Sequence, residues 1–367
     1  MKVLHVAQPV DGGVARVVET FAVDQSRRGW EPTVACPPTG ELPDNLARRG
    51  VSTRSWPAQR SPVRNVLSEI SALTTIVRET DPDVIHLHGS KAGLVGRLAV
   101  RGSRPTLFQP HLWSFESEPG PTVRPARYWE RVAARWTECV VCVSEDEHLA
   151  GIRASVRCRY TVIHNGIDTD VVRPRDRGEV RRELGLPDDG PIAVCVARLA
   201  PLKGQDMLLD AWPSVLAASP SAHLVLVGDG PLREQLQDEH PMGKHPSVLW
   251  MGWSDRATDF FAAADVVVVP SRAEGMAIVP LEAMATGRSV VAFDAGGIRD
   301  SVGDVGAVLP IGDISGLSSE ISRRLADPEF TAVEGERARK RAVVLFDHRR
   351  ASDAAAELVV SVASTRR

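Results

Sequence analysis

The sequence has few of the residues that mark secreted, disulfide-rich or membrane-spanning chains. Its 367 residues include five cysteines, an odd and low number, and aromatic residues make up only 5%. An odd, low cysteine count fits a reducing compartment better than a disulfide framework. No run reaches the roughly 18 apolar residues of a membrane helix, and residues 1–7 are too short and interrupted for a signal peptide. We therefore expect a cytoplasmic protein.

The chain also has no large excess of charge of either sign. Its 44 Lys and Arg residues face 47 Asp and Glu residues, for a net charge of -3. A basic field that attracts nucleic acid is thus absent, and we expect no nucleic-acid partner. With 43% hydrophobic and 25% charged residues, the composition is that of a globular protein whose length suits two domains.

The two closest cysteines, Cys139 and Cys142, form a C-x-x-C pair inside an apolar run. This run predicts a buried strand, and strand positions three apart point to opposite faces. A redox pair or metal clip needs both sulfur atoms on one side. We therefore expect buried structural thiols.

Short Val-, Ile- and Leu-rich runs alternate with helical patterns along the chain. The runs predict strands at residues 2–7, 33–36, 84–87, 106–109, 139–143 and 160–163, and again at 192–196, 223–227, 248–251, 266–269 and 289–293. Continuous apolar strands are typical of parallel sheets that are buried on both faces. Alternation with helices, such as 14–29, 63–80 and 123–136, predicts doubly wound α/β domains.

The pattern divides the chain into two similar halves. Residues 165–190 are rich in proline, glycine and charge, and predict a linker with one short helix at 180–184. We predict Rossmann-like domains at residues 1–170 and 171–345, and a C-terminal helix at 346–367 that packs back on the first domain. Open α/β sheets bind ligands at the carboxyl ends of their strands, so functional residues are expected in the loops that follow strands.

Two cations follow the predicted strand at 192–196. Arg198 and Lys203 lie in the segment RLAPLKG, just before a predicted helix. The N–H groups and dipole of a helix N-terminus favour an anion. A diphosphate fits this pattern, since arginine can bind it bidentately. The alternative is two solvated cations on a loop.

Two glutamates follow the predicted strand at 266–269, in the segment EGMAIVPLEAMA. Pro280 suits the first turn of a helix that carries Glu282, and Gly275 is small enough for close approach of a ligand. Carboxylates such as Glu274 and Glu282 can accept hydrogen bonds from sugar and ribose hydroxyl groups. Surface charge is the alternative, although Glu282 lies among apolar helix residues, where an unpartnered carboxylate is rare.

Two positions in the first half also lie at strand ends. His111 follows the strand at 106–109, and both a structural and a catalytic role are open for it. Gly12 and Gly13 lie between the first strand and the first helix. They allow close approach of a phosphate or an acceptor, although a tight turn alone also explains them.

Two other motifs are incomplete matches to known sites. Gly228 and Gly230 follow a strand as in a dinucleotide fingerprint, but the third glycine is replaced by Arg233, which argues against a dehydrogenase. Residues 168–170, Asp-Thr-Asp, resemble a paired-acid metal motif, but we expect them to shape a turn.

Together these segments resemble family four of the retaining glycosyltransferases over nearly the whole chain. The segment EGMAIVPLEAMATG matches the family signature, VARLAPLKG its diphosphate loop, VIHNGID its interdomain segment and LVGDGP its mid-domain turn. Residues 86–93, HLHGSKAG, are similar to members that act in polysaccharide assembly or tailoring. The chain departs from the pattern at Ala277, where Gly or Pro is common, and at Arg299–Asp300, where Pro-Glu is common.

The resemblance implies a GT-B fold, in which two Rossmann-like domains face each other across a cleft. Residues 1–170 would bind the acceptor and residues 171–345 the nucleotide sugar. Arg198 and Lys203 would hold the donor diphosphate, Glu282 the ribose, and His111 would lie beside the sugar. The implied catalytic residues are His111, Arg198, Lys203 and Glu274, and the implied donor-binding residues are Gly13, Gly230, Glu274, Gly275, Met276, Ala277 and Glu282.

The implied activity is transfer of a hexose-type sugar with retained configuration, and it needs no metal ion or cofactor. A UDP-sugar is the favoured donor and GDP-mannose the next, while the acceptor is a hydroxyl group of a glycan, a lipid-linked molecule or a small molecule. The alternatives are a sugar-nucleotide epimerase or phosphorylase of the same fold, or a two-lobed sugar-binding module without catalysis.

One predicted helix leaves membrane contact open. Residues 124–136 carry four arginines and three large aromatic residues. Basic amphipathic helices can rest on anionic membranes, which would suit a lipid-linked acceptor. Glu130 interrupts the basic pattern, and a solvated face is the alternative.

Overall fold

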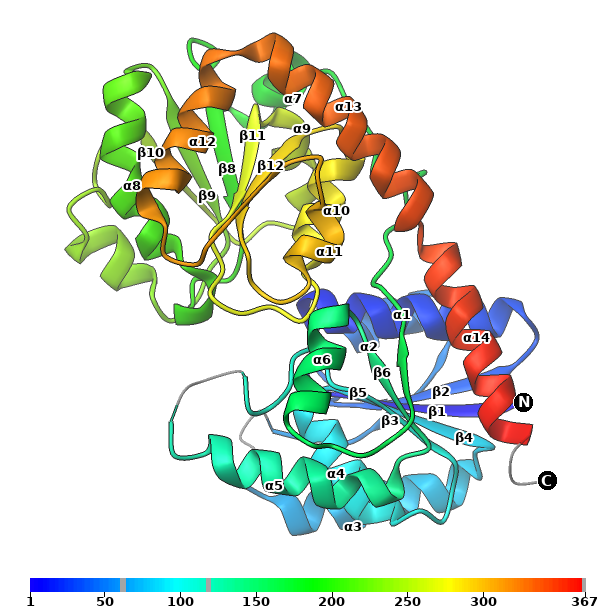
Figure 1. Ribbon diagram of the computed structural model, residues 1–367. Coiled ribbons are helices and arrows are strands. Elements are labelled where there is room, and N and C mark those ends of the chain that lie inside the picture. Colours follow the sequence, from blue (N-terminus) through cyan, green and yellow to red (C-terminus); the bar gives the residue numbers. More distant parts are fainter. Residues whose placement is uncertain (60–63, 117–119, 365–367) are drawn as a thin grey trace. The chain divides into compact units, whose positions relative to one another are not determined.

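The structure is a computed structural model that describes residues 1–59, 64–116 and 120–364 (Figure 1). The chain forms two compact units. One comprises residues 1–165 together with 348–367, and the other comprises residues 166–347. The chain thus passes between the units at 165/166 and again at 347/348, near the predicted boundaries at 170 and 345.

The N-terminal unit is built on a seven-stranded sheet in the order β3-β2-β1-β4-β5-β6-β7. All neighbouring strands are parallel. The strands are β1 (Lys2–Ala7), β2 (Glu31–Cys36), β3 (Ser52–Ser55), β4 (Val84–His88), β5 (Thr106–Gln109), β6 (Cys139–Cys142) and β7 (Tyr160–Val162). The helices are α1 (Gly12–Arg27), α2 (Glu41–Arg48), α3 (Val66–Thr80), α4 (Ser90–Val100), α5 (Val123–Ala133), α6 (Glu145–Arg153) and α14 (His348–Ser364).

The strand order of this sheet reverses between β1 and β4. From β1 the chain moves outward to β2 and β3, then returns to place β4 on the other side of β1. Strand β4 is buried along its whole length, and β1 is buried after its first residue. Ligand sites of open α/β sheets lie at such a reversal, beyond the carboxyl ends of the strands.

The C-terminal helix α14 belongs to the N-terminal unit and lies beside α1 (Figure 1). Its buried residues Ala351, Ala355, Leu358 and Val362 recur at helical spacing and form its apolar face. Arg28, which follows α1, forms an ion pair with Asp353 of α14. A helix from the end of the chain thus covers a unit built from its beginning.

The C-terminal unit has a six-stranded parallel sheet in the order β10-β9-β8-β11-β12-β13. Its strands are β8 (Ile192–Val196), β9 (His223–Val227), β10 (Val248–Gly252), β11 (Val266–Val269), β12 (Ser289–Phe293) and β13 (Ala307–Leu309). Its helices are α7 (Arg177–Leu184), α8 (Gln205–Ala218), α9 (Ala257–Ala263), α10 (Ile278–Ala285), α11 (Ile298–Val302), α12 (Ile314–Ala326) and α13 (Pro328–Leu345).

Two edge strands were not predicted, and their residues explain why. β3 is the polar segment Ser-Thr-Arg-Ser and is largely exposed, while β13 has only three residues. An edge strand with a solvated face does not need the continuous apolar run that marks the central strands. The end of the chain forms α12, α13 and α14, and Asp327 caps the start of α13 by accepting a hydrogen bond from the N–H of Phe330.

Both thiols of the C-x-x-C pair are free and buried in β6, as predicted. Burial raises the pKa of Cys139 to about 12 and raises that of Cys142 further. A thiol held in its neutral form is a poor nucleophile and a poor metal ligand. The pair therefore belongs to the core.

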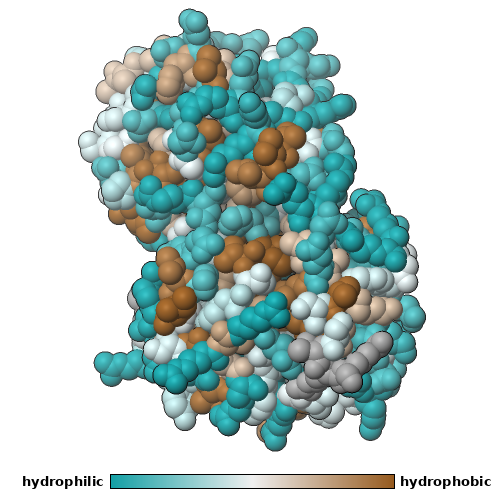
Figure 2. Space-filling view, turned by 45° about the vertical axis from the view of Figure 1, so that its right-hand side comes forward, coloured by the Kyte–Doolittle hydropathy of each residue, from teal (hydrophilic) through white to brown (hydrophobic). Residues whose placement is uncertain are grey.

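Hydrophobic residues on the surface are scattered. On the face shown in Figure 2, hydrophilic residues predominate and the hydrophobic ones form small separate groups. The most exposed large apolar side chains are Leu67, Val171 and Tyr128, which lie in different segments of the chain. Within the part of the chain that the structure describes, no helix is long and apolar enough to span a membrane.

Candidate functional site

The C-terminal sheet reverses its strand order between β8 and β11. From β8 the chain moves outward to β9 and β10, and from β11 it moves the opposite way to β12 and β13. The loops that follow β8 and β11 therefore leave the sheet in different directions and open a crevice at its carboxyl edge. These two loops hold the predicted diphosphate residues and the predicted glutamate.

The structure joins these loops through an ion pair. The Nζ atom of Lys203, in the 3₁₀ turn Pro201–Lys203 after β8, lies 2.5 Å from Oε1 of Glu274, which follows β11. The Lys203 side chain is 30% exposed and that of Glu274 is 11% exposed, so the ion pair is partly accessible to solvent. Between the same loops, the N–H of Arg272 donates a hydrogen bond to the carbonyl of Leu202, at 2.7 Å.

The loop after β8 is also fixed to its neighbours. The amide of Gln205 donates to the carbonyl of Arg198 (3.0 Å), and the N–H of Leu199 donates to the carbonyl of Asp229 (3.1 Å). A Cβ atom at Gly230 would lie 2.3 Å from the carbonyl oxygen of Leu199, so a side chain there would displace the loop. The position predicted to bind the donor thus also has a packing reason to be glycine.

The cations near this edge differ in whether they are neutralised. Arg272 forms two hydrogen bonds with the carboxylate of Asp206, at 2.8 and 2.5 Å, and Arg299 forms an ion pair with Asp294. Arg198 is exposed, and none of the described residues forms a hydrogen bond or ion pair with its guanidinium group. Arg198 therefore offers an uncompensated positive charge next to the Lys203 loop.

A helix N-terminus adds to this positive potential. Helix α10 starts at Ile278, and its N-cap residue Ala277 has no side chain that accepts a hydrogen bond. Its first turn carries no acidic residue. The first N–H groups of a helix and its dipole favour an anion. Gly275 and the buried Met276 immediately precede this turn.

The loop after β12 encloses the same segment. Gly296 has φ +53°, and a Cβ atom there would lie 1.8 Å from the carbonyl oxygen of Glu274. The N–H of Gly297 donates to the carbonyl of Gly275, at 2.8 Å. The contact leaves no room for a side chain, and the positive φ favours glycine. Gly296 is therefore required for the shape of the Glu274 loop.

Glu282 lies on α10 and is 5% exposed. Its place on the helix that starts behind the Glu274 loop matches the predicted position, since Pro280 occupies the first turn. A carboxylate buried to this degree needs polar partners. Its predicted contact with ribose remains a prediction.

Gly13 and His111 belong to the N-terminal unit, so the structure groups them apart from the residues described above. Gly13 lies in the first turn of α1, which starts at Gly12. His111 follows β5 with φ +61°, a left-handed conformation that is uncommon outside glycine. Burial lowers the pKa of His111 to about 3, so its ring is neutral at physiological pH.

Sequence reasoning missed the residues behind His111. Its Nε2 atom lies 3.2 Å from Nδ1 of His88, the last residue of β4, and His88 in turn contacts His5 of β1. The signal was present as the H-L-H of residues 86–88 at the end of a strand.

A cavity in the C-terminal unit lies at the opposite edge of the sheet. Its volume is about 490 Å³, and its lining includes Pro191, Asp265 and Arg288, which directly precede β8, β11 and β12. Two of its arginines form hydrogen bonds with helix ends: Arg288 donates to the carbonyl of Ala262 in α9, and Arg339 to that of Ala285 in α10. Cations at helix C-termini are a common structural device.

Two further sequence motifs have structural roles or stay untested. Asp168 accepts hydrogen bonds from the N–H groups of Asp170 and Val171, both at 3.1 Å, which confirms that it shapes a turn.

In α5, Arg131 donates to the carbonyl of Ala154, while the side chain of Tyr128 is 69% exposed. Contact of α5 with a membrane stays a prediction.

The neutral state of His111 predicts a pH-dependent stability. Its pKa is about 3 in the folded protein and 6.5 in a free side chain, so the unfolded chain takes up a proton first on acidification. Between pH 7 and pH 5 this proton lowers the free energy of unfolding by about 2 kcal/mol. His111→Asn, which suits a positive φ, should remove that loss. Urea titrations at both pH values test this, and an equal pH dependence in both proteins contradicts it.

Comparisons with known proteins agree with this geometry. A family model described as Glycosyltransferase Family 4 matches residues 11–171, and one described as Glycosyl transferases group 1 matches residues 190–327. D-inositol 3-phosphate glycosyltransferase 1 of Catenulispora acidiphila is 30% identical over 360 residues, which cover 88% of this chain and 84% of that protein.

Two other similarities extend over most of the chain. The UDP-Gal:alpha-D-GlcNAc-diphosphoundecaprenol alpha-1,3-galactosyltransferase of Escherichia coli is 29% identical over 302 residues, 78% of each chain. The crystal structure of Anabaena HepE in complex with UDP and glucose has a TM-score of 0.85 and 26% identity, and covers 98% of this chain and 100% of that chain. The expectations for family and fold are confirmed: this chain belongs to glycosyltransferase family 4 and has the GT-B fold.

Proposed function

We propose that the protein transfers a hexose from a UDP-sugar to a hydroxyl group of an acceptor, with retained anomeric configuration and without a metal ion. The observation that carries this proposal is the pair Lys203–Glu274 beside the uncompensated Arg198, at the carboxyl edge where the C-terminal sheet reverses. A cation pair beside a carboxylate suits a ligand that is negative at its diphosphate and rich in hydroxyl groups at its sugar.

The chemical problem is the cleavage of the bond between the sugar and the diphosphate. Negative charge grows on the departing diphosphate while the sugar becomes positive. Arg198, Lys203 and the N-terminal turn of α10 supply fixed positive potential for that charge. Preorganised charge of this kind lowers the barrier because it needs no rearrangement during the reaction. It also serves the purpose of a metal ion at the diphosphate.

The carboxylates then have separate roles. Glu274 accepts hydrogen bonds from sugar hydroxyl groups while its contact with Lys203 orients it. Glu282 accepts hydrogen bonds from the ribose. No carboxylate is assigned as a nucleophile, unlike in retaining glycoside hydrolases. The departing phosphate takes the proton of the acceptor hydroxyl, and the new bond forms on the face that the diphosphate leaves.

The choice of UDP draws on similar proteins. The Escherichia coli relative is named for UDP-Gal, and the Anabaena structure holds UDP and glucose. Both are similar to this chain over most of its length. GDP-mannose is the second donor to consider, and an epimerase, a phosphorylase or a binding module are the competing activities.

Removal of a cation at the reversal point should weaken both binding and turnover. Arg198→Ala and Lys203→Ala should each raise the Kd for UDP about tenfold, the equivalent of one charge-assisted contact. Each should lower kcat roughly 100-fold, because the cation acts most strongly on the departing charge. Calorimetry with UDP and assays of nucleotide release measure the two effects.

The matched control for these variants is Arg175→Gln. Arg175 lies near the cavity at the opposite edge and forms ion pairs with Glu183 and Asp259. The control should bind UDP as the natural protein does. Full turnover in Arg198→Ala and Lys203→Ala, or loss of UDP binding in the control alone, would place the donor elsewhere.

A donor panel tests the proposed function as a whole. The protein is incubated with UDP-, GDP-, ADP- and dTDP-sugars in EDTA, and free nucleotide is measured. We expect slow hydrolysis of a UDP-hexose without acceptor, its loss in Glu282→Ala, and retained configuration at the anomeric carbon by proton NMR. Inverted product, or activity abolished by EDTA, contradicts the mechanism.

The same panel separates the competing activities. A phosphorylase requires inorganic phosphate, and an epimerase changes the sugar without net release of nucleotide. A binding module protects the protein against heat in the presence of a donor but releases no nucleotide. Release from GDP-mannose alone would keep the reaction and replace the donor.

A further inference from the structure

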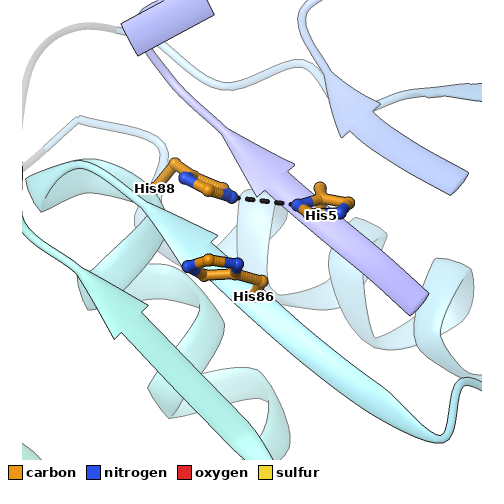
Figure 3. A group of neighbouring side chains, drawn as sticks. All are labelled: His5, His86 and His88. Atoms are coloured by element: carbon orange, nitrogen blue, oxygen red, sulfur yellow. Dashed lines mark hydrogen bonds between the residues drawn. The ribbon is translucent and has the colours of Figure 1, made fainter. Parts of the chain in front are cut away.

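The N-terminal unit contains a chain of hydrogen-bonded side chains that ends at His111. Oε1 of Gln25, in α1, lies 2.9 Å from Nε2 of His5. Nδ1 of His5 lies 3.0 Å from Nε2 of His88, and Nδ1 of His88 lies 3.2 Å from Nε2 of His111. Figure 3 shows the central link, which connects the neighbouring strands β1 and β4.

The chain runs from the core towards the surface. Gln25, His5 and His88 are at most 2% exposed, whereas His111 is half-buried in the loop after β5. Burial lowers the pKa of His5 to about 4 and lowers that of His88 well below its ordinary value. Each ring is therefore neutral, with one nitrogen that donates and one that accepts a hydrogen bond.

The amide at the buried end gives the chain a direction. The Gln25 oxygen can only accept, so the Nε2 of His5 carries the proton and its Nδ1 accepts. The Nε2 of His88 must then donate to His5, and the Nδ1 of His88 must accept from His111. His111 is therefore protonated on Nε2, and its Nδ1 holds a lone pair.

We propose that Gln25, His5 and His88 are positioning residues that hold His111 in its Nε2–H tautomer, so that its Nδ1 is left to accept a hydrogen bond from a hydroxyl group of a ligand. Among the residues that the structure describes, none forms a hydrogen bond with that Nδ1 atom. The tautomer follows from the hydrogen-bond chain alone, and that the ligand is a sugar rests on the proposed function.

A metal ion is the competing interpretation of the same residues. Nitrogen atoms of His5, His86 and His88 lie within 4.8 Å of one another, and all three side chains are buried. A tetrahedral zinc ion, however, would hold two nitrogens about 3.4 Å apart with the ion between them. The observed 3.0 Å between His5 and His88 is an ordinary hydrogen bond.

The ring orientations support the hydrogen-bonded chain. The rings of His86 and His88 lie 4.0 Å apart with an angle of 34° between their planes, so His86 covers the face of His88 (Figure 3). Metal ligands instead point the edge of each ring at the ion. His86 thus packs against the chain of hydrogen bonds without being a link in it.

The experiment is nitrogen-15 NMR of the full-length protein labelled at histidine. Protonated and unprotonated imidazole nitrogens have different chemical shifts, and His111→Asn assigns the signals of His111. We expect one neutral Nε2–H tautomer at His111 between pH 6 and pH 8. In Gln25→Leu, which removes the fixed acceptor, both tautomers of His111 should appear.

His86→Phe is the matched control, since it keeps a ring against His88 but removes no link. The His111 signals should not change in this variant. An Nδ1–H tautomer in the natural protein, a single unchanged tautomer in Gln25→Leu, or zinc that copurifies and is lost in His86→Phe would each overturn the proposal. The readout needs no sugar transfer, so a failure of the proposed function would leave this result unaffected.

Discussion

The ion pair between Lys203 and Glu274 spans the point at which the C-terminal sheet reverses its strand order. The reversal makes the loops after β8 and β11 diverge, and without a link they would be free to separate. The ion pair and the hydrogen bond from the N–H of Arg272 to the carbonyl of Leu202 hold these loops together. The exposed Arg198 lies in the first of these loops, and α10 starts at the end of the second.

The N-terminal sheet also reverses its strand order, but the side chains at its reversal point are neutral rather than charged. The reversal lies between β1 and β4, and these strands contribute His5 and His88. Burial keeps both rings neutral, so they interact through hydrogen bonds rather than through charge. The C-terminal reversal point thus carries cationic side chains, while the N-terminal one carries neutral rings. The different chemistry follows from how deeply each group is buried.

The central strands and the site loops could be predicted because each depends on residues close in sequence. Apolar runs mark the strands, and Pro280 and the nearby glycines mark a turn into a helix. The edge strand β3 escaped because its residues are polar. Neither the Lys203–Glu274 contact nor the histidine chain could be predicted, since both join segments that are distant in sequence and are brought together by strand order.

The central claim is that the C-terminal reversal point binds the diphosphate of the donor. A crystal structure of the protein with UDP tests it most directly. The account predicts phosphate oxygens within hydrogen-bond distance of Arg198 and Lys203 and of the first N–H groups of α10, with ribose hydroxyl groups on Glu282. A nucleotide bound instead in the arginine-lined cavity at the opposite edge of the sheet would contradict it.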